Sequence, residues 1–231
     1  MPTTPDATTR REPVPSHGRP RTPGRPTVLL ALCASLFTLL TWQVITDGPV
    51  RRLDESVGRD LRSSLLPRPV AELFADLGNM TVALPVLGAV IACTAWCGHR
   101  AAMPRWWLPP LSAVLAMAAV PALVVPLKAI VDRAAPPGMD GTGYYPSGHT
   151  ATATVAYGAA TLLLLPRLRT PRTRRTLAVA CALLNLGVGL GLVSRGYHWP
   201  ADAVASWLLG GLVLSAMTVV CTRCERPSAE E

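Results

Sequence analysis

Long runs of apolar residues alternate along the chain with shorter polar segments. Six of these runs approach the roughly 20 residues that a helix needs to cross about 30 Å of hydrocarbon. They cover residues 27–45, 81–96, 106–127, 149–165, 177–193 and 201–221. The pattern predicts an all-α, polytopic membrane protein in which six transmembrane helices make up one domain, 27–221.

The segments on either side of this domain are polar. Residues 1–26 are rich in Pro, Arg, Thr and Ser and lack apolar periodicity, so we expect a disordered basic tail. No small-residue cleavage pattern clearly follows the first apolar run, which indicates a retained anchor rather than a secretory signal peptide. Residues 222–231 form a second, shorter tail.

Arginines are placed unevenly around the apolar runs. Those that precede the first run, and those between the fourth and fifth, are Arg10, Arg11, Arg19, Arg21, Arg25, Arg167, Arg169, Arg172, Arg174 and Arg175. Because loops rich in Lys and Arg stay in the cytoplasm, we expect both tails to be cytoplasmic. The protein would be integral to the plasma membrane, with loops 46–80, 128–148 and 194–200 on the extracytoplasmic side.

Composition narrows the class of partners. Half of the 231 residues are hydrophobic and 16% are charged, with a formal net charge of +8. The basic residues cluster beside apolar runs, not on a folded basic face interleaved with aromatic residues as nucleic-acid binding requires. We therefore expect contacts with anionic membrane lipids and no binding of nucleic acid. Nothing in the pattern predicts an oligomeric state.

Two segments on the expected outer side contain candidate catalytic residues. The first, PSGH at 146–149, stands where the fourth apolar run begins, and Ser147 suits the start of a helix. The unpaired N–H groups of a first helical turn attract an anion, and Gly148 lets a phosphate approach the backbone closely. His149 would stand beside that phosphate and donate a proton to a leaving oxygen.

The second segment is HWPAD at 198–202, before the sixth run. Pro200 is a favourable first residue of a helix, and Asp202 follows His198 by four positions, so the two side chains can meet across the helix start. A carboxylate on one imidazole nitrogen fixes the tautomer and directs the other nitrogen at a substrate. His198 is therefore a candidate nucleophile.

Each histidine taken singly has a purely structural explanation. His149 would cap a helix, and His198 would be an interfacial residue. Their placement on the same side as Lys128, Arg133 and Arg195 favours a functional site, because ionisable groups that gather at the ends of membrane helices are typical of one.

These motifs resemble the signature of the phosphatidic acid phosphatase type 2 superfamily, membrane lipid phosphatases related to the soluble vanadium haloperoxidases. That signature is Lys, six residues and Arg-Pro, then PSGH, then Ser-Arg, five residues, His, three residues and Asp. The resemblance covers about residues 50–221. It implies the helical bundle of that superfamily and a phosphatase that needs no metal and no other cofactor.

The resemblance also implies a role for each matching residue. His198 would attack phosphorus and form a phosphohistidine intermediate, Asp202 would orient it, and His149 would be the general acid. The residues implied to bind the phosphate are Lys128, Ser147, Gly148 and Arg195.

The chain departs from the signature twice. Ala135 stands where the family has Arg, although Arg133 lies two positions earlier and would point the same way in an extended segment. Arg195 and His198 are also separated by three residues fewer than in the family pattern. Both departures remove or displace a cation that would bind phosphate.

The sequence as a whole predicts a membrane phosphatase acting on a lipid phosphate, such as phosphatidate or a polyprenyl phosphate or diphosphate, at the outer leaflet. The candidate residues are His198, His149 and Asp202 for catalysis, and Lys128, Arg133, Ser147, Gly148 and Arg195 for the phosphate. The alternative is an impaired family member that binds, flips or scaffolds lipid phosphates. A vanadate-dependent haloperoxidase is disfavoured by the apolar runs.

Overall fold

The chain is helical throughout the part that the structure describes. A computed structural model describes residues 25–62 and 66–225, and no strand occurs within these ranges. Of the expected tails, residues 1–24 and 226–231 lie outside these ranges and stay predictions, whereas residues 25–26 and 222–225 are helical. The all-α fold class is confirmed for the described residues.

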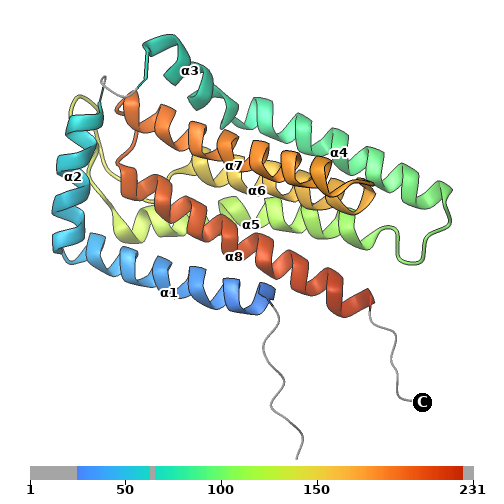
Figure 1. Cartoon of the computed structure of the whole chain (residues 1–231). Helices are drawn as coiled ribbons and strands as arrows, with labels where there is room; N and C mark the ends of the chain where they lie inside the picture. The colour runs from blue at the N-terminus through green and yellow to red at the C-terminus, as the bar shows by residue number, and fades with distance from the viewer. Residues whose placement is uncertain (1–24, 63–65, 226–231) are drawn as a thin grey trace, which may run out of the picture.

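Within those residues, long helices lie side by side and shorter ones gather at one end of the bundle (Figure 1). The long helices are α1 (Arg25–Ile45), α4 (Met80–Arg100), α5 (Leu108–Val131), α6 (Gly148–Leu164), α7 (Pro171–Ser194) and α8 (Pro200–Glu225). The shorter helices at that end are α2 (Pro49–Leu61) and α3 (Arg68–Leu77), whereas a 3-10 helix, η1 (Leu165–Arg167), directly follows α6.

The count of membrane spans differs from the prediction. Among the described residues, five helices are long and apolar enough to cross a membrane, namely α1, α4, α5, α7 and α8. The fourth predicted span, 149–165, corresponds to α6, which has only 17 residues. At 1.5 Å per residue it is about 26 Å long, shorter than the roughly 30 Å of hydrocarbon. Because α6 packs against α4, α5, α7 and α8, its neighbours are protein and its length need not match the lipid.

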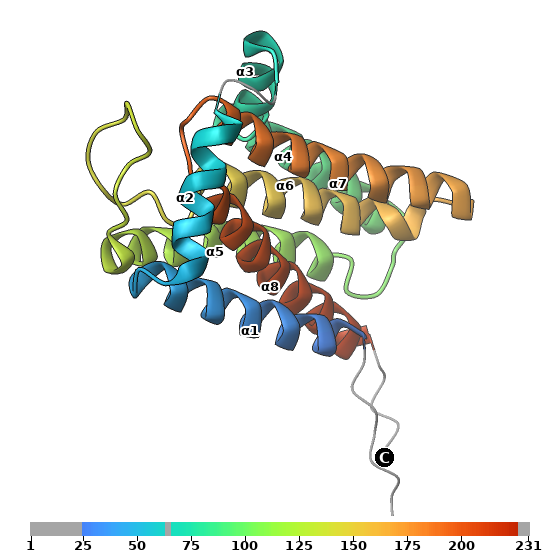
Figure 2. The same ribbon diagram turned by 60° about the vertical axis from the view of Figure 1, so that its left-hand side comes forward.

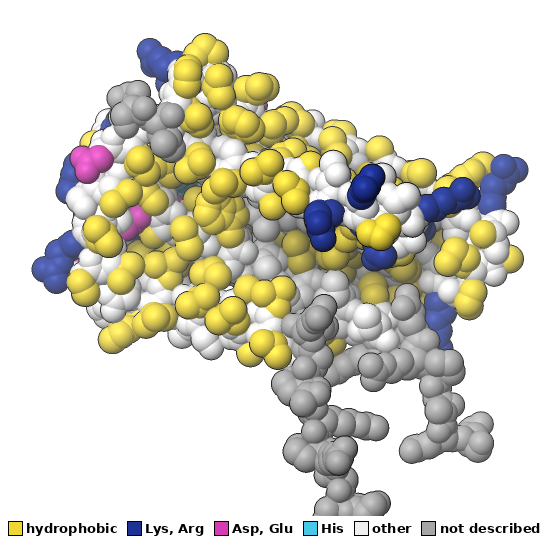
Figure 3. Space-filling view, in the orientation of Figure 1, with side chains coloured by type: hydrophobic (Ala, Val, Ile, Leu, Met, Phe, Trp, Pro, Cys, Tyr) yellow, Lys and Arg dark blue, Asp and Glu magenta, His cyan; other side chains and the backbone are white. Residues whose placement is uncertain are grey.

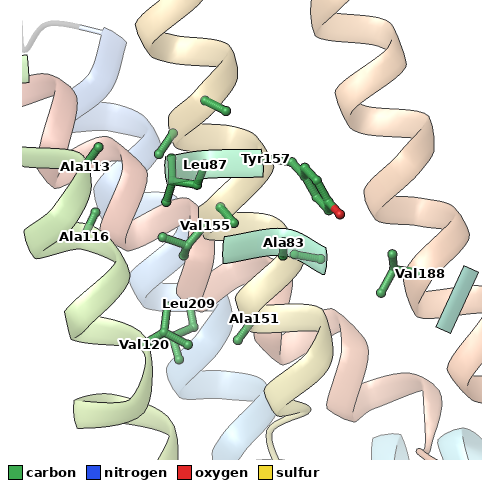
Figure 4. Close-up of a cluster of buried hydrophobic side chains, with 14 of the residues drawn as sticks. Ala83, Leu87, Ala113, Ala116, Val120, Ala151, Val155, Tyr157, Val188 and Leu209 are labelled. Atoms are coloured by element: carbon green, nitrogen blue, oxygen red, sulfur yellow. The ribbon is translucent and has the colours of Figure 1, made fainter. Parts of the chain in front are cut away.

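Small side chains allow the other helices to approach α6 closely. Ala151, Ala156 and Ala159 are almost completely buried, and a Cβ on Gly158 would lie 2.3 Å from a methyl carbon of Leu214. Close approach through small residues is how membrane helices gain packing energy, since lipid tails are as apolar as Leu. Figure 4 shows this core, where Val155 of α6 meets residues of α5 and α8.

The segment expected as a long outer loop, 46–80, contains α2 and α3. Neither is long or apolar enough to appear as a membrane span, so hydropathy alone misses them. Helix α2 is amphipathic and stands across the end of the bundle (Figures 1 and 2). Its inner face buries Asp54 and Gly58, four residues apart, whereas Leu53 is 64% exposed. Helix α3 packs against α7.

The two ends of the bundle carry different elements and different charges. Helices α2 and α3 lie at one end, whereas the start of α1, the end of α8 and the α4–α5 connection lie at the other (Figure 1). On the face shown in Figure 3, Lys and Arg stand at both ends of an apolar flank, and Asp and Glu only at the end with α2. Both sequence motifs lie at this mixed-charge end, where α6 and α8 begin.

Candidate active site

His198 and Asp202 form the contact that their spacing predicts. His198 lies in the turn between α7 and α8, and its Nδ1 is 3.1 Å from Oδ2 of Asp202 in the first turn of α8. The same oxygen accepts the backbone N–H of Trp199 at 3.0 Å. Asp202 is completely buried and His198 is 9% exposed. Because a carboxylate accepts from Nδ1–H, the Nε2 lone pair remains for a substrate.

The start of α6 is bonded directly to the start of α8. The backbone N–H of Ser147 donates to the carbonyl of Asp202 at 3.1 Å. The Ser206 hydroxyl lies 2.8 Å from the carbonyls of both Ser147 and Asp202. Ser147 itself is buried, and its Oγ caps α6 by accepting the N–H of Thr150 at 3.3 Å. These bonds bring the two motifs together and hold them at a fixed separation.

The first turn of α6 is open on the side of Gly148 and His149. A Cβ on Gly148 would meet no atom within 4 Å, and His149 is exposed. The N–H groups of these two residues have no acceptor within the helix, because they belong to its first turn, and they lie at the positive end of the helix dipole. Behind His149, Gly78 packs so closely that a Cβ there would lie 3.2 Å from the His149 Cβ. The geometry leaves room for an anion at the helix start.

Lys128 stands in the last turn of α5 and is half-buried. Its Nζ donates one hydrogen bond to the carbonyl of Gly143 at 2.8 Å. Gly143 adopts a φ of +78°, a conformation that favours glycine, so the loop after α5 can fold back onto Lys128. An ammonium has three donors, so two remain for a phosphate.

Arg133 is 2% exposed and lies between two carboxylates. Its Nη1 donates to Oδ1 of Asp202 at 2.8 Å, and its Nη2 donates to Oδ2 of Asp54 at 2.6 Å. Burial alone would lower the pKa of the Arg133 guanidinium, but Asp202 and Asp54 together raise it, so Arg133 stays charged. Burial raises the pKa of the Asp54 carboxyl, and the ion pair with Arg133 opposes that rise. A direct contact of Arg133 with phosphate stays a prediction.

Arg195 caps the end of α7 and is mostly covered by neighbouring side chains. Its Nη2 donates to the Tyr197 hydroxyl at 3.3 Å and lies 3.7 Å from a carboxylate oxygen of Glu72 on α3. The Arg195 Nε is buried and has no hydrogen-bond partner among the described residues. Gly196 follows with a φ of +69°, which lets the shortened segment turn back towards α8.

Several residues at this end were not predicted from the sequence. Asp54 pairs with Arg133, and Ser206 links the two motifs. The Tyr144 ring packs edge to face against the His198 ring, with 5.6 Å between the ring centroids. Arg62 donates to the Pro137 carbonyl and packs over Gly196. No sequence signal separates Asp54 from the other acids of α2, because only the packing of α2 onto the bundle decides which of them is buried.

Within the described residues, no group of three or more His, Cys, Asp or Glu side chains is arranged to hold a metal ion. The chemistry that the residues themselves offer is a nucleophilic imidazole, a second imidazole able to carry a proton, and fixed positive charge. This combination is suited to transfer of a phosphoryl group, which depends on positioning and on stabilising charge at the equatorial oxygens.

The fold is that of a helical membrane protein with an Asp–His pair and a second His close to the starts of two of its helices, α8 and α6. The chain matches the model of the PAP2 superfamily over residues 109–226, just over half of its length, and it belongs to that family. A search of curated proteins gives no match.

The fold is also similar to a solved structure. The crystal structure of a transmembrane PAP2-type phosphatidylglycerolphosphate phosphatase from Bacillus subtilis aligns with a TM-score of 0.68 and 21% sequence identity. The alignment covers 90% of this chain and 99% of that chain. The likeness therefore extends beyond the segment matched by the family model and includes the bundle as a whole.

Replacing Gly58 with alanine is expected to destabilise the protein and slow its reaction. A Cβ at this position would lie 2.8 Å from Trp199 Cε3 and 3.0 Å from Pro200 Cδ, both parts of rigid rings. Alanine adds about 1 kcal/mol of helix propensity, but overpacking costs about 1–3 kcal/mol, so the clash outweighs the gain. Because Trp199 adjoins His198, its displacement also disturbs the site. Thermal unfolding in detergent and the turnover rate measure both effects.

Gly88 in α4 provides the matched control. It is also helical, but a Cβ there meets no atom within 4 Å. Gly88→Ala is therefore expected to leave the unfolding midpoint unchanged or to raise it. Equal midpoints for the two alanine variants would contradict the packing of α2 against Trp199.

Proposed function

We propose that this protein is a membrane phosphatase that hydrolyses the phosphomonoester or diphosphate of a lipid through a phosphohistidine intermediate. The observation that carries the proposal is the buried Asp202–His198 pair beside the open first turn of α6. This pair lies at the end of the membrane-spanning helices, where a lipid would present its head group while its tails remain in hydrocarbon.

The proposed reaction uses two histidines in turn. The Nε2 lone pair of His198 attacks phosphorus, and the bond from phosphorus to the leaving oxygen breaks. His149 donates a proton to that oxygen, which leaves as an alcohol or a phosphate. His149 then takes a proton from water as the water attacks the phosphohistidine, which releases phosphate and restores His198. Throughout, Asp202 holds the His198 ring.

We propose that Lys128, the first turn of α6 at Ser147 and Gly148, and Arg195 bind the phosphate. Lys128 has donors to spare after its bond to Gly143. Gly148 leaves open space in front of the helix start. No metal ion is needed in this scheme, because protein cations and backbone N–H groups stabilise the charge that develops on the phosphoryl oxygens.

The proposed orientation places the site on the extracytoplasmic side and both tails in the cytoplasm. The arginines of the α6–α7 connection lie at the bundle end opposite the site, the end at which α1 begins (Figure 1). Loops rich in arginine stay in the cytoplasm. The substrate would then be drawn from the outer leaflet of the plasma membrane.

The candidate substrates share a phosphate at the membrane surface and an apolar tail. Phosphatidate, polyprenyl phosphates and polyprenyl diphosphates all fit this description. Phosphatidylglycerolphosphate joins them, because the Bacillus subtilis protein of similar fold is named for it.

A second candidate function is a family member that binds lipid phosphates without hydrolysing them. Two observations favour it. Ala135 replaces the arginine of the family signature, and both terminal nitrogens of Arg133 are already bonded to carboxylates. The phosphate would then meet fewer cations than in the family pattern, which lowers the rate of phosphoryl transfer.

Phosphate release from purified protein distinguishes the two functions. The protein in detergent is offered phosphatidate, phosphatidylglycerolphosphate, undecaprenyl phosphate and undecaprenyl diphosphate, with EDTA present. We expect saturable release of phosphate from at least one lipid, unchanged by the chelator. A parallel preparation of His198→Ala controls for contaminating phosphatases. Binding of these lipids without release from any of them would favour the second function.

A further inference from the structure

We propose that Asp54 and Arg133 are positioning residues for His198. Arg133, held between Asp54 and Asp202, fixes the carboxylate that orients the His198 ring. The inference rests on the proposed function and deepens it, because it assigns α2 a part in the reaction although α2 contributes neither histidine.

The contacts form one continuous chain of buried groups. Asp54 binds Nη2 of Arg133 at 2.6 Å, Nη1 of Arg133 binds Asp202 at 2.8 Å, and Asp202 binds His198 at 3.1 Å. Asp54 is 8% exposed, Arg133 2% and Asp202 0%. The face of the Trp199 ring covers the guanidinium, with its centroid 5.4 Å from Cζ. Arg133 also lies 3.7 Å from a carboxylate oxygen of Glu55, which is farther than its distances to Asp54 and Asp202. A displacement of Asp54 is therefore passed through Arg133 mainly to Asp202.

Asp54 also acts on Asp202 by a second route. Its Oδ1 accepts the backbone N–H of Ala201 at 2.7 Å. Ala201 lies in the first turn of α8 next to Asp202, so one carboxylate on α2 holds both the side-chain partner of Asp202 and the backbone beside it. The first turn of α8 is thereby fixed relative to α2, and His198 precedes that turn by two residues.

The geometry is poorly suited to direct phosphate binding by Arg133. Arg133 is 2% exposed, and the Trp199 ring lies over its guanidinium. A phosphate could reach the remaining N–H groups, including the unpartnered Nε, only if this buried packing opened. Buried ion pairs are also a costly route to stability, which apolar residues of similar volume often supply equally well. Their presence beside the nucleophile is therefore better explained by the orientation that they impose on Asp202.

Comparing the binding of orthovanadate with that of inorganic phosphate tests whether Arg133 positions His198 or binds the phosphate itself. Orthovanadate accepts a fifth ligand, so its binding depends on an oriented His198 as well as on the cations. Inorganic phosphate depends on the cations and backbone N–H groups alone. Measured by titration calorimetry, Asp54→Asn is expected to weaken orthovanadate binding by about tenfold or more and phosphate binding by less than about twofold. A loss of folded protein would lower the number of sites and leave both affinities unchanged.

Asp60→Asn is the matched control, since it removes the same charge from an exposed position of the same helix. It is expected to change neither affinity. If Asp54→Asn fails to fold, the double variant Asp54→Asn with Arg133→Gln removes both charges and leaves no unpaired buried guanidinium. It is expected to show the same selective loss of orthovanadate binding.

The outcomes bear separately on the inference and on the proposed function. Equal weakening of both oxyanions would assign Arg133 to the phosphate site and overturn the inference, as would wild-type affinity for orthovanadate in the Asp54 variants. Selective loss of orthovanadate binding in a protein that releases no phosphate from lipids would support the positioning role and refute the phosphatase. A wild-type protein that binds no orthovanadate would refute both.

Discussion

Replacing His198 with alanine is expected to abolish phosphate release from every lipid substrate, lowering turnover by at least about 10³-fold. Without an imidazole at this position, the chain has no nucleophile paired with Asp202, and the phosphohistidine cannot form. Release of inorganic phosphate from the preferred lipid, measured at a saturating concentration, checks this. A variant that retains a tenth of the wild-type turnover would show that water is attacked directly or that another residue is the nucleophile.

Two other histidines sharpen this test. His99 lies in the last turn of α4, at the opposite end of the bundle. There its ring packs edge to face against Trp106, with 5.1 Å between the ring centroids. His99→Ala should therefore leave turnover unchanged. His149→Ala should slow hydrolysis of lipids strongly but affect p-nitrophenyl phosphate less, because nitrophenolate leaves without a proton. His198→Ala should be inactive towards both, which separates the nucleophile from the general acid.

Asp202→Asn is expected to lower turnover by about 10³–10⁴-fold, although the two side chains have nearly the same size. The Asp202 carboxylate accepts from His198, from the Trp199 backbone and from Arg133. An amide has one accepting oxygen, so its NH₂ group must face at least one of these donors. Facing His198, it imposes the wrong tautomer. Facing Arg133, it leaves a buried guanidinium short of one partner, which costs about 3–5 kcal/mol of stability.

Turnover at a temperature well below the unfolding midpoint, together with the midpoint itself, separates these two effects. Asp132→Asn is the control, because Asp132 is exposed, adjoins Arg133 and has a φ of 45°, a conformation that asparagine tolerates well. It should match the wild type in both measurements. An Asp202→Asn protein with the stability of the wild type and undiminished turnover would refute the orienting role of Asp202.

The membrane helices could be predicted from the sequence because hydropathy over about 20 residues is a local property. Five of the expected spans meet that criterion, and α6 does not. Helix α6 was still located to within a residue at each end, but its surroundings could not be inferred. A central helix and a lipid-facing helix are both apolar, and only their packing distinguishes them. The amphipathic α2 and the short α3 have fewer apolar residues in a row than a membrane span needs, so hydropathy does not detect them.

In the candidate site, too, contacts between residues close in sequence could be predicted, and contacts between distant residues could not. The His198–Asp202 contact follows from a four-residue spacing at a helix start, and Ser147 caps α6 as its residue type predicts. The partners of Arg133 do not follow from spacing, because Asp54 is 79 residues away along the chain and Asp202 is 69. The prediction that Arg133 binds phosphate rests on its place two residues before Ala135 and on the shared outer side, and neither carries information about these distant carboxylates.

By itself, then, the sequence determined the helical class, most of the spans, the family and the two histidine motifs. Each of these is encoded in composition or in residues close together along the chain. Tertiary structure alone decided that α6 is the centre of the bundle, that α2 covers its end, and that Arg133 faces two carboxylates and not open space. The physical reason is that burial and ion pairing depend on which distant segments meet, and no local pattern of residues specifies that.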